Sequence, residues 1–212
     1  MFTSRSILLK TIHILTSGVP FIVAVNTPVI AETNQINFKL YPNKPFVACM
    51  AASAKVTPTV DAVVKRGGLN DTLTLTLRNF KPGLKFDLFT IQRSNQLANG
   101  KPDPKFKNFG LAWYQSDVEA NKSVAIKTIL LDQIFGFDPD VALDPTQTLH
   151  VGFWFNNPAD VEPCGFAGPP TPFNGEHKAG PVAFITRPNA ATKLGPLCTN
   201  PNLKTRPATC NP

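Results

Sequence analysis

The stretch TLTLTLRNFKPGLKFDLFTIQ, residues 72–92, decides the fold class that the sequence predicts. In its first part, leucines at positions 73, 75 and 77 alternate with threonines at positions 72, 74 and 76. Successive side chains of a β-strand point to opposite faces, so the leucines predict a core face and the threonines a solvated face. Pro82 and Gly83 indicate a turn. Residues 85–92 are then expected to return as the second strand of a hairpin.

The same period-two pattern recurs along the chain, and the 21 prolines and 13 glycines favour turns over long helices. A long loop is expected at 156–180. About eight short strands separated by turns predict an all-β fold, namely an antiparallel β-sandwich with long loops and a disulfide-pinned C-terminal tail. The further strands are expected at 36–41, 56–65, 109–116, 123–131, 148–155 and 181–187.

Residues 1–31 have the features of a secretory signal peptide: a basic start, an apolar stretch and small or β-branched residues before Glu32. A membrane anchor is the alternative, but His13 and Pro20 interrupt the apolar run, and a spanning helix needs about 20 apolar residues. We therefore expect a secreted or periplasmic protein that is free of the membrane after cleavage. The expected organisation is a signal peptide (1–31), a β-sandwich domain (32–187) and a Pro/Asn-rich tail (188–212).

The cysteines predict disulfide bonds. Cys49, Cys164, Cys198 and Cys210 form an even set, which in an exported chain favours two disulfides. No CxxC or CxxH spacing supports a zinc site instead. Three pairings are open, and we favour Cys164–Cys198 with Cys49–Cys210, because the region after residue 187 has little apolar periodicity and needs links to the domain.

Three segments carry resemblances. The segment LTLTLRNFKPGLKFDLFTI (73–91) resembles the strand–turn–strand element of chordin-type domains and of copper/zinc superoxide dismutases, which are antiparallel sandwiches. The segments NFGLAWYQSDVEAN (108–121) and PFNGEHKAGPVAFI (172–185) resemble parts of uncharacterised exported bacterial proteins. The second resemblance implies no activity.

The dismutase activity is not expected to carry over. The copper–zinc centre of that family needs several histidines from neighbouring strands, whereas only His150 and His177 remain after residue 31. In FDLFTI, Asp87 and Thr90 stand where metal-binding histidines would be needed.

Charge is unevenly distributed along a chain whose net charge is +7. Residues 128–177 contain no lysine or arginine, and the rest of residues 32–212 then has a net charge of +12. Such asymmetry predicts a cation, a basic partner or a second copy of the chain as binding partner. The alternative is that the two parts interleave in the fold and their fields average out. The acidic residues of this segment are Asp132, Asp138, Asp140, Asp144, Asp160, Glu162 and Glu176.

Three of these acids are candidate calcium ligands. Asp138, Asp140 and Asp144 lie close together in sequence, and Ca²⁺ takes six to eight oxygen ligands, often from such loops. No EF-hand pattern is present, and aspartate before proline is also a common turn residue. Calcium is the one cofactor that the sequence suggests.

The strand expected at 148–155, TLHVGFWF, supplies a second candidate site. Its alternation puts Leu149, Val151, Phe153 and Phe155 on the core face. His150 and Trp154 then share the outward face and, with Trp113, could form a ligand-binding patch. The alternative is that another layer or the 156–180 loop covers this face.

His177 and Glu176 form a third candidate site. A hydrolase would need a nucleophile and an acid that orients the base, and the chain has no GxSxG motif. A non-enzyme is therefore favoured over an enzyme.

Together these features predict an exported, non-catalytic interaction or structural module of the cell envelope or extracellular space. One alternative is a calcium- or small-ligand-binding protein that uses residues 128–177. Another is a hydrolase that uses His177 or His150. Nucleic acid is not expected as a partner of an exported chain, whereas an acidic envelope polymer or self-association is.

Overall fold

The structure is a computed structural model that describes residues 35–67, 70–128, 148–169 and 179–198, together with the backbone of 201–202 and 209–210. The predicted signal peptide, residues 1–31, lies outside the described residues.

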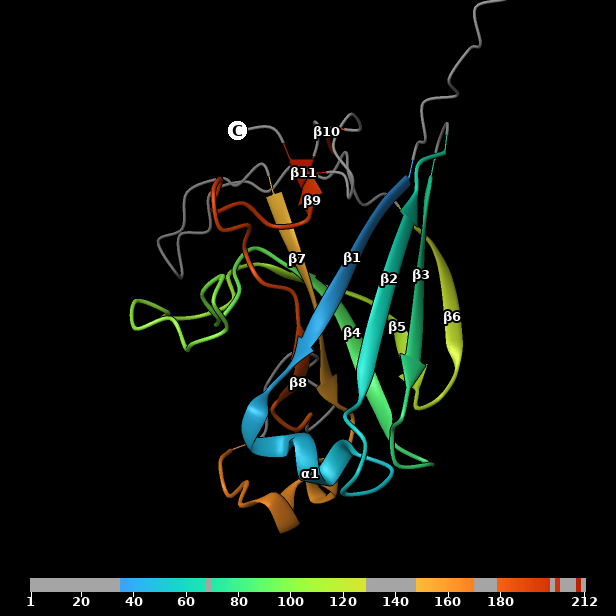
Figure 1. The fold of residues 1–212 in the computed structure, drawn as a ribbon, viewed down its shortest axis with the longest axis vertical. Coiled ribbons are helices and arrows are strands. Elements are labelled where there is room, and N and C mark those ends of the chain that lie inside the picture. The colour runs from blue at the N-terminus through green and yellow to red at the C-terminus, as the bar shows by residue number, and fades with distance from the viewer. Residues whose placement is uncertain are drawn as a thin grey trace, which may run out of the picture. The chain divides into compact units, whose positions relative to one another are not determined.

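Within the described residues, strands are the main secondary structure and there is one short helix, so the predicted all-β antiparallel class is confirmed. Eight strands follow the order β5-β4-β7-β8-β1-β2-β3-β6 (Figure 1). A short strand β9 pairs with β7, and β10 pairs with β11. The bounds are β1 (Gln35–Pro42), β2 (Thr59–Lys65), β3 (Asp71–Arg78), β4 (Lys85–Ile91), β5 (Ala112–Glu119), β6 (Ser123–Thr128), β7 (Thr148–Phe155), β8 (Val182–Ile185), β9 (Leu197–Cys198), β10 (Pro201–Asn202) and β11 (Thr209–Cys210).

The eight strands form one nearly closed, barrel-like sheet, and two separate stacked sheets are not shown. The reason lies in β1. Its residues 35–40 pair with β2, whereas Tyr41 and Pro42 pair with β8. β1 therefore joins one half of the sheet (β2, β3 and β6) to the other half (β8, β7, β4 and β5). The two ends of the strand order, β5 and β6, are consecutive in the chain and lie next to each other.

The hairpin predicted at residues 72–92 is wrong, although both of its strands exist. β3 pairs with β2 and β6, whereas β4 pairs with β5 and β7. The connection between them folds into the core, because Asn79 adopts a left-handed conformation (φ 65°) and Phe80 is fully buried. The Asn121 side chain holds the peptide of Phe80 through two hydrogen bonds, to its N–H (2.9 Å) and its carbonyl (2.7 Å). The chain therefore crosses to the other half of the sheet.

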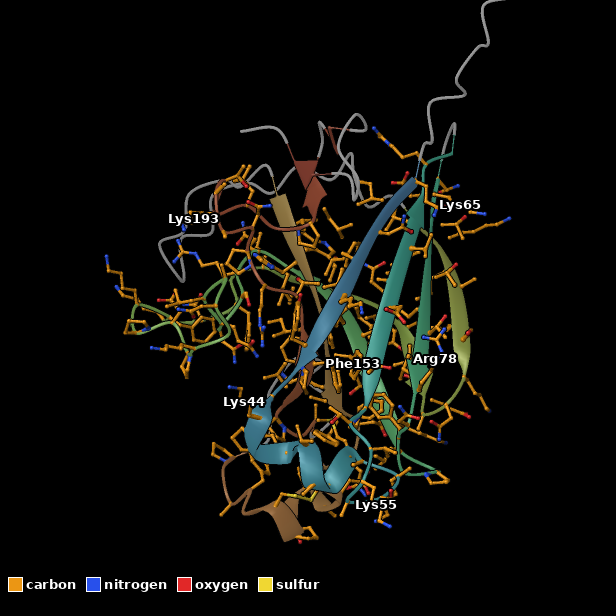
Figure 2. All side chains as sticks on the ribbon, viewed as in Figure 1. Lys44, Lys55, Lys65, Arg78, Phe153 and Lys193 are labelled. Atoms are coloured by element: carbon orange, nitrogen blue, oxygen red, sulfur yellow. A yellow bond between two sulfur atoms is a disulfide. The ribbon has the colours of Figure 1, made fainter. Side chains whose placement is uncertain are left out.

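The core fills the inside of this sheet. Leu73, Leu75 and Leu77 are at most 2% exposed, as their alternation predicts. On β7 the predicted core face is also confirmed, and Phe153, labelled in Figure 2, stacks on Phe184 with ring centroids 5.3 Å apart. The alternating leucines and the phenylalanines thus line one continuous interior.

Two turns close one end of the sheet. They are η1 (Lys44–Phe46) with α1 (Val47–Met50), and η2 (Pro158–Asp160) with η3 (Glu162–Cys164) (Figure 1). Phe46 packs edge-to-face on Phe155 and Phe166, with ring centroids 6.2 Å apart in both pairs. We call residues 44–50 and 158–166 the cap.

A disulfide joins the two halves of the cap, from Cys49 to Cys164, with Cα atoms 6.1 Å apart. The favoured pairs Cys164–Cys198 and Cys49–Cys210 are therefore wrong. The prediction assumed that the C-terminal region needed the links, whereas the bond joins two turns 115 residues apart that pack on the same end of the sheet. The side chains of Cys198 and Cys210 lie outside the described residues.

Part of the region predicted as a tail packs onto the sheet. We call residues 186–197 the arm. Leu197 at its end is fully buried in the core, and β9 pairs with β7 through Leu149 and Thr148. The arm therefore belongs to the same packed unit as the strands.

Candidate functional site

A groove of about 650 Å³ lies on the outward face of β1 and β2. The arm borders one side, and Ala98 brings in the loop between β4 and β5. Ligand sites are typically concave and of this size, about 300–1,000 Å³. Its lining residues are Asn37, Phe38, Lys39, Tyr41, Asp61, Ala62, Val63, Ala98, Thr186, Arg187, Pro188, Asn189, Leu194, Gly195 and Pro196.

The alternation of β1 builds the floor of the groove. Ile36 and Leu40 are buried in the core, so Asn37, Lys39 and Tyr41 emerge on the outer face. The register with β2 sets Lys39 beside Asp61. The floor is a fixed surface because residues 35–40 of β1 pair with β2, which also pairs with β3.

The arm forms the wall. The Thr186 N–H donates to the Val151 carbonyl (2.9 Å), which ties the start of the arm to β7. Asn189 then organises a turn by accepting the N–H groups of Ala191 (2.8 Å) and Thr192 (3.1 Å). Gly195 approaches β7 so closely that a Cβ would lie 2.3 Å from the Leu149 carbonyl oxygen. Only glycine permits this contact, which presses the arm onto the sheet.

Arg187 is fixed at the junction of wall and floor. Its Cζ lies 3.8 Å from the centroid of the Tyr41 ring, a cation–π contact. Its Nε donates to Gln96 Oε1 (2.8 Å). Gly100, at φ +79°, packs so tightly that a Cβ would lie 2.5 Å from Cζ. The guanidinium is therefore held from three sides before any ligand arrives.

The side-chain amide and carboxylate oxygens of the groove are already engaged. The Asn37 Oδ1 accepts from Gln35 Nε2 (2.8 Å). The Asn189 Oδ1 accepts from the backbone of its own turn. The Asp61 carboxylate pairs with Arg78 and, at 3.9 Å, with Lys39.

The donors of the groove, in contrast, remain available. Within the described residues, Nη1 and Nη2 of Arg187 and the Nδ2 groups of Asn37 and Asn189 make no hydrogen bond. An occupant rich in acceptors would therefore match this lining.

The loop between β4 and β5 and the arm, which both contribute to the groove lining, also carry exposed cations. We call Arg93, Lys101, Lys105, Lys107 and Lys193 the basic rim; all five are exposed. None forms an ion pair within the described residues. In Figure 2, Lys193 lies on the side of the molecule from which the loop between β4 and β5 projects. Unpaired cations gathered on these two segments attract anions.

His150 lies on the outward face of β7 with Trp154, as predicted, but it is only 5% exposed. The Thr186 hydroxyl accepts the Val151 N–H (3.0 Å) and shares a hydrogen bond with His150 Nδ1 (2.9 Å). Burial lowers the pKa of His150 to about 4, and a hydrogen bond to the Thr186 backbone opposes this shift in part. The arm covers this face, so His150 is a neutral structural residue.

The predicted aromatic patch does not come together. Trp154 is 1% exposed and packs edge-to-face against Phe89 and Phe109. Trp113 is 37% exposed on β5, where its register through Thr90 puts it on the opposite face of the sheet. The loop between β4 and β5 covers Trp154 through Phe109, and the sequence did not indicate this contact.

The remaining predicted site residues lie outside the described part of the chain: His177, Glu176, Asp138, Asp140 and Asp144. Within the described residues no group of three or more His, Cys, Asp or Glu could hold a metal. Nor does that part of the chain contain a helix that is long and apolar enough to cross a membrane.

The groove residues were missed at the level of sequence. Tyr41 and Arg187 stand at the ends of two predicted strands, 36–41 and 181–187, and nothing in the sequence indicates that these ends pair. Comparison of the chain with protein-family models, with curated proteins and with solved structures finds no match.

Proposed function

We propose that the protein is an exported, non-catalytic binding module whose ligand occupies the groove between β1, β2 and the arm. The observation that carries the proposal is Arg187. Its guanidinium is positioned by Tyr41, Gln96 and Gly100 at the edge of a concave surface, with two donor groups left for a ligand. Preorganisation of this kind reduces the cost of binding.

Two observations support export. The Cys49–Cys164 disulfide is typical of oxidising compartments outside the cytosol. Residues 1–31 have the composition of a signal peptide.

The hydrolase alternative has less support where it uses His150. A general base needs access to the substrate and a pKa near the working pH. His150 is covered by the arm, and burial lowers its pKa to about 4. A hydrolase that uses His177 stays a prediction. So does a calcium site at Asp138, Asp140 and Asp144.

The groove is tested by filling it. Val63 on β2 lines the groove, whereas its cross-strand neighbour Thr74 on β3 does not. We expect Val63→Trp to abolish binding of an acidic or neutral oligosaccharide probe and Thr74→Trp to leave it unchanged. The probes are tetramers of galacturonic acid, its methyl ester and xylose, and the measurement is calorimetric titration. Binding that survives Val63→Trp, or no saturable binding of any of the three, would reject the groove as the ligand site.

A further inference from the structure

The ligand class can be inferred from the groove's free hydrogen-bonding groups, an inference that rests on the proposed function. We propose that the groove binds a carboxylate-bearing oligosaccharide, a uronic-acid oligomer, whose carboxylate pairs with Arg187. Two features support this assignment: the free donors of the groove and the basic rim.

The free donors define the anchor. Because Nε of Arg187 donates to Gln96, the edge formed by Nη1 and Nη2 remains for a ligand. A planar guanidinium edge matches the two oxygens of a carboxylate in a bidentate pair. The single carboxylate of the lining, Asp61, is paired with Arg78 and Lys39, so it opposes an incoming anion little.

The other free donors suit a sugar. The Nδ2 groups of Asn37 and Asn189 can donate to hydroxyl and ring oxygens, while Val63 and Leu194 offer apolar surface to a sugar face. Neutral amides and a small apolar area beside one fixed cation favour an acidic sugar over a bare inorganic anion.

The basic rim indicates a polymer. Four of its cations lie on the loop between β4 and β5 and one lies on the arm, and none of them lines the groove itself. A single carboxylate would use Arg187 alone, whereas an oligomer with a carboxylate on every residue can contact the rim as well. Such exposed contacts add long-range attraction that salt screens.

An extended acidic peptide is the competing ligand class. Peptides commonly bind by adding a strand to a free sheet edge. Residues 35–40 of β1 pair with β2, and only Tyr41 and Pro42 pair with β8. The free side-chain donors of the groove favour the oligosaccharide, and a glutamate tetramer is the competing probe.

The decisive experiment varies the ligand and leaves the protein unchanged. Calorimetry compares a galacturonic-acid tetramer with the same tetramer methyl-esterified, which keeps the sugar and removes the charge. The free acid should bind about tenfold or more tightly, since the ester cannot form the charge-assisted pair with Arg187. Equal affinities, with both lost in Val63→Trp, would overturn the carboxylate inference while the proposed function stands. Tighter binding of a glutamate tetramer than of the galacturonic-acid tetramer would overturn the oligosaccharide class.

Variants then locate the carboxylate. Arg187→Lys keeps the charge but removes the two parallel N–H donors of the guanidinium. We expect about tenfold weaker binding of the free acid and little change for the ester. Removing three rim charges together, Lys101→Gln, Lys105→Gln and Lys107→Gln, should reduce affinity and flatten its dependence on salt. The matched control is Lys44→Gln with Lys55→Gln, whose side chains lie at the cap end in Figure 2. An Arg187→Lys protein that melts normally and binds the acid unchanged would overturn the assignment.

Discussion

His150 is predicted to make stability depend on pH. Burial lowers its pKa to about 4 in the folded protein, against an ordinary value of 6.5. As pH falls from about 6.5 to about 4, the unfolded chain takes up a proton that the folded chain does not. The contribution of His150 to the free energy of unfolding should therefore fall across this window, by about 3 kcal/mol in total, and no further below it.

The test compares the wild type with His150→Gln by urea unfolding at pH 7 and pH 4.5. Other groups titrate equally in both proteins, so the difference isolates the histidine. The wild type should lose more stability on acidification than the variant. Identical losses would mean that His150 is solvated.

Phe153 is predicted to be one of the costliest positions to truncate. It is fully buried, with its ring centroid 4.8 Å from Phe86 and 5.3 Å from Phe184. Phe153→Ala leaves a cavity among these rings and should lower the free energy of unfolding by about 3–5 kcal/mol. Leu97→Ala, at a position that is 36% exposed, is the control and should change it little. A loss below 1 kcal/mol for Phe153→Ala would contradict the assigned core.

These two residues also show what the sequence could predict. The period-two alternation of β7 put Phe153 inside and His150 outside, and both assignments are confirmed. The burial of His150 was not predictable, because its cover comes from the arm. Contact between residues 150 and 186 depends on tertiary packing, for which the local pattern carries no signal.

At the scale of elements, the cap is predicted to depend on its disulfide. Cys49 and Cys164 close a loop of 115 residues, and long loops gain most from such a link. Cys49→Ser with Cys164→Ser should lower the free energy of unfolding by about 2–5 kcal/mol. Unfolding midpoints in urea measure this directly. The wild type under reducing conditions should match the variant, and an unchanged midpoint would show that packing of Phe46 alone holds the cap.

The strands were largely predictable and their pairing was not. Residues 72–78 and 85–92 become β3 and β4, yet the expected hairpin fails because Phe80 enters the core and Asn121 binds its peptide. A Pro-Gly turn predicts that the chain reverses direction, but it does not predict that the strands before and after it pair with each other. The same limit hid the groove, which depends on β1 pairing with both β2 and β8.

At the scale of the whole molecule, the charge distribution predicts weak self-association. Residues 128–177 carry seven acidic residues and no lysine or arginine, whereas the rest of residues 32–212 has a net charge of +12. The acidic segment of one copy could compete with a ligand for the basic rim of another. Sedimentation should then show oligomers at low salt that dissociate at about 0.5 M salt, where exposed charges are screened within a few ångströms. A monomer at low salt would contradict this prediction.

The central claim is that an acidic ligand binds in the groove at Arg187, and backbone NMR tests it most directly. Galacturonic-acid tetramer is titrated into ¹⁵N-labelled protein, with the cap as internal reference. The account predicts saturable shifts of the amides of Asn37, Tyr41, Ala98, Arg187 and Asn189, and unchanged signals for residues 44–50. Shifts that centre on the cap or on residues 128–177, or no saturable shifts at all, would contradict it.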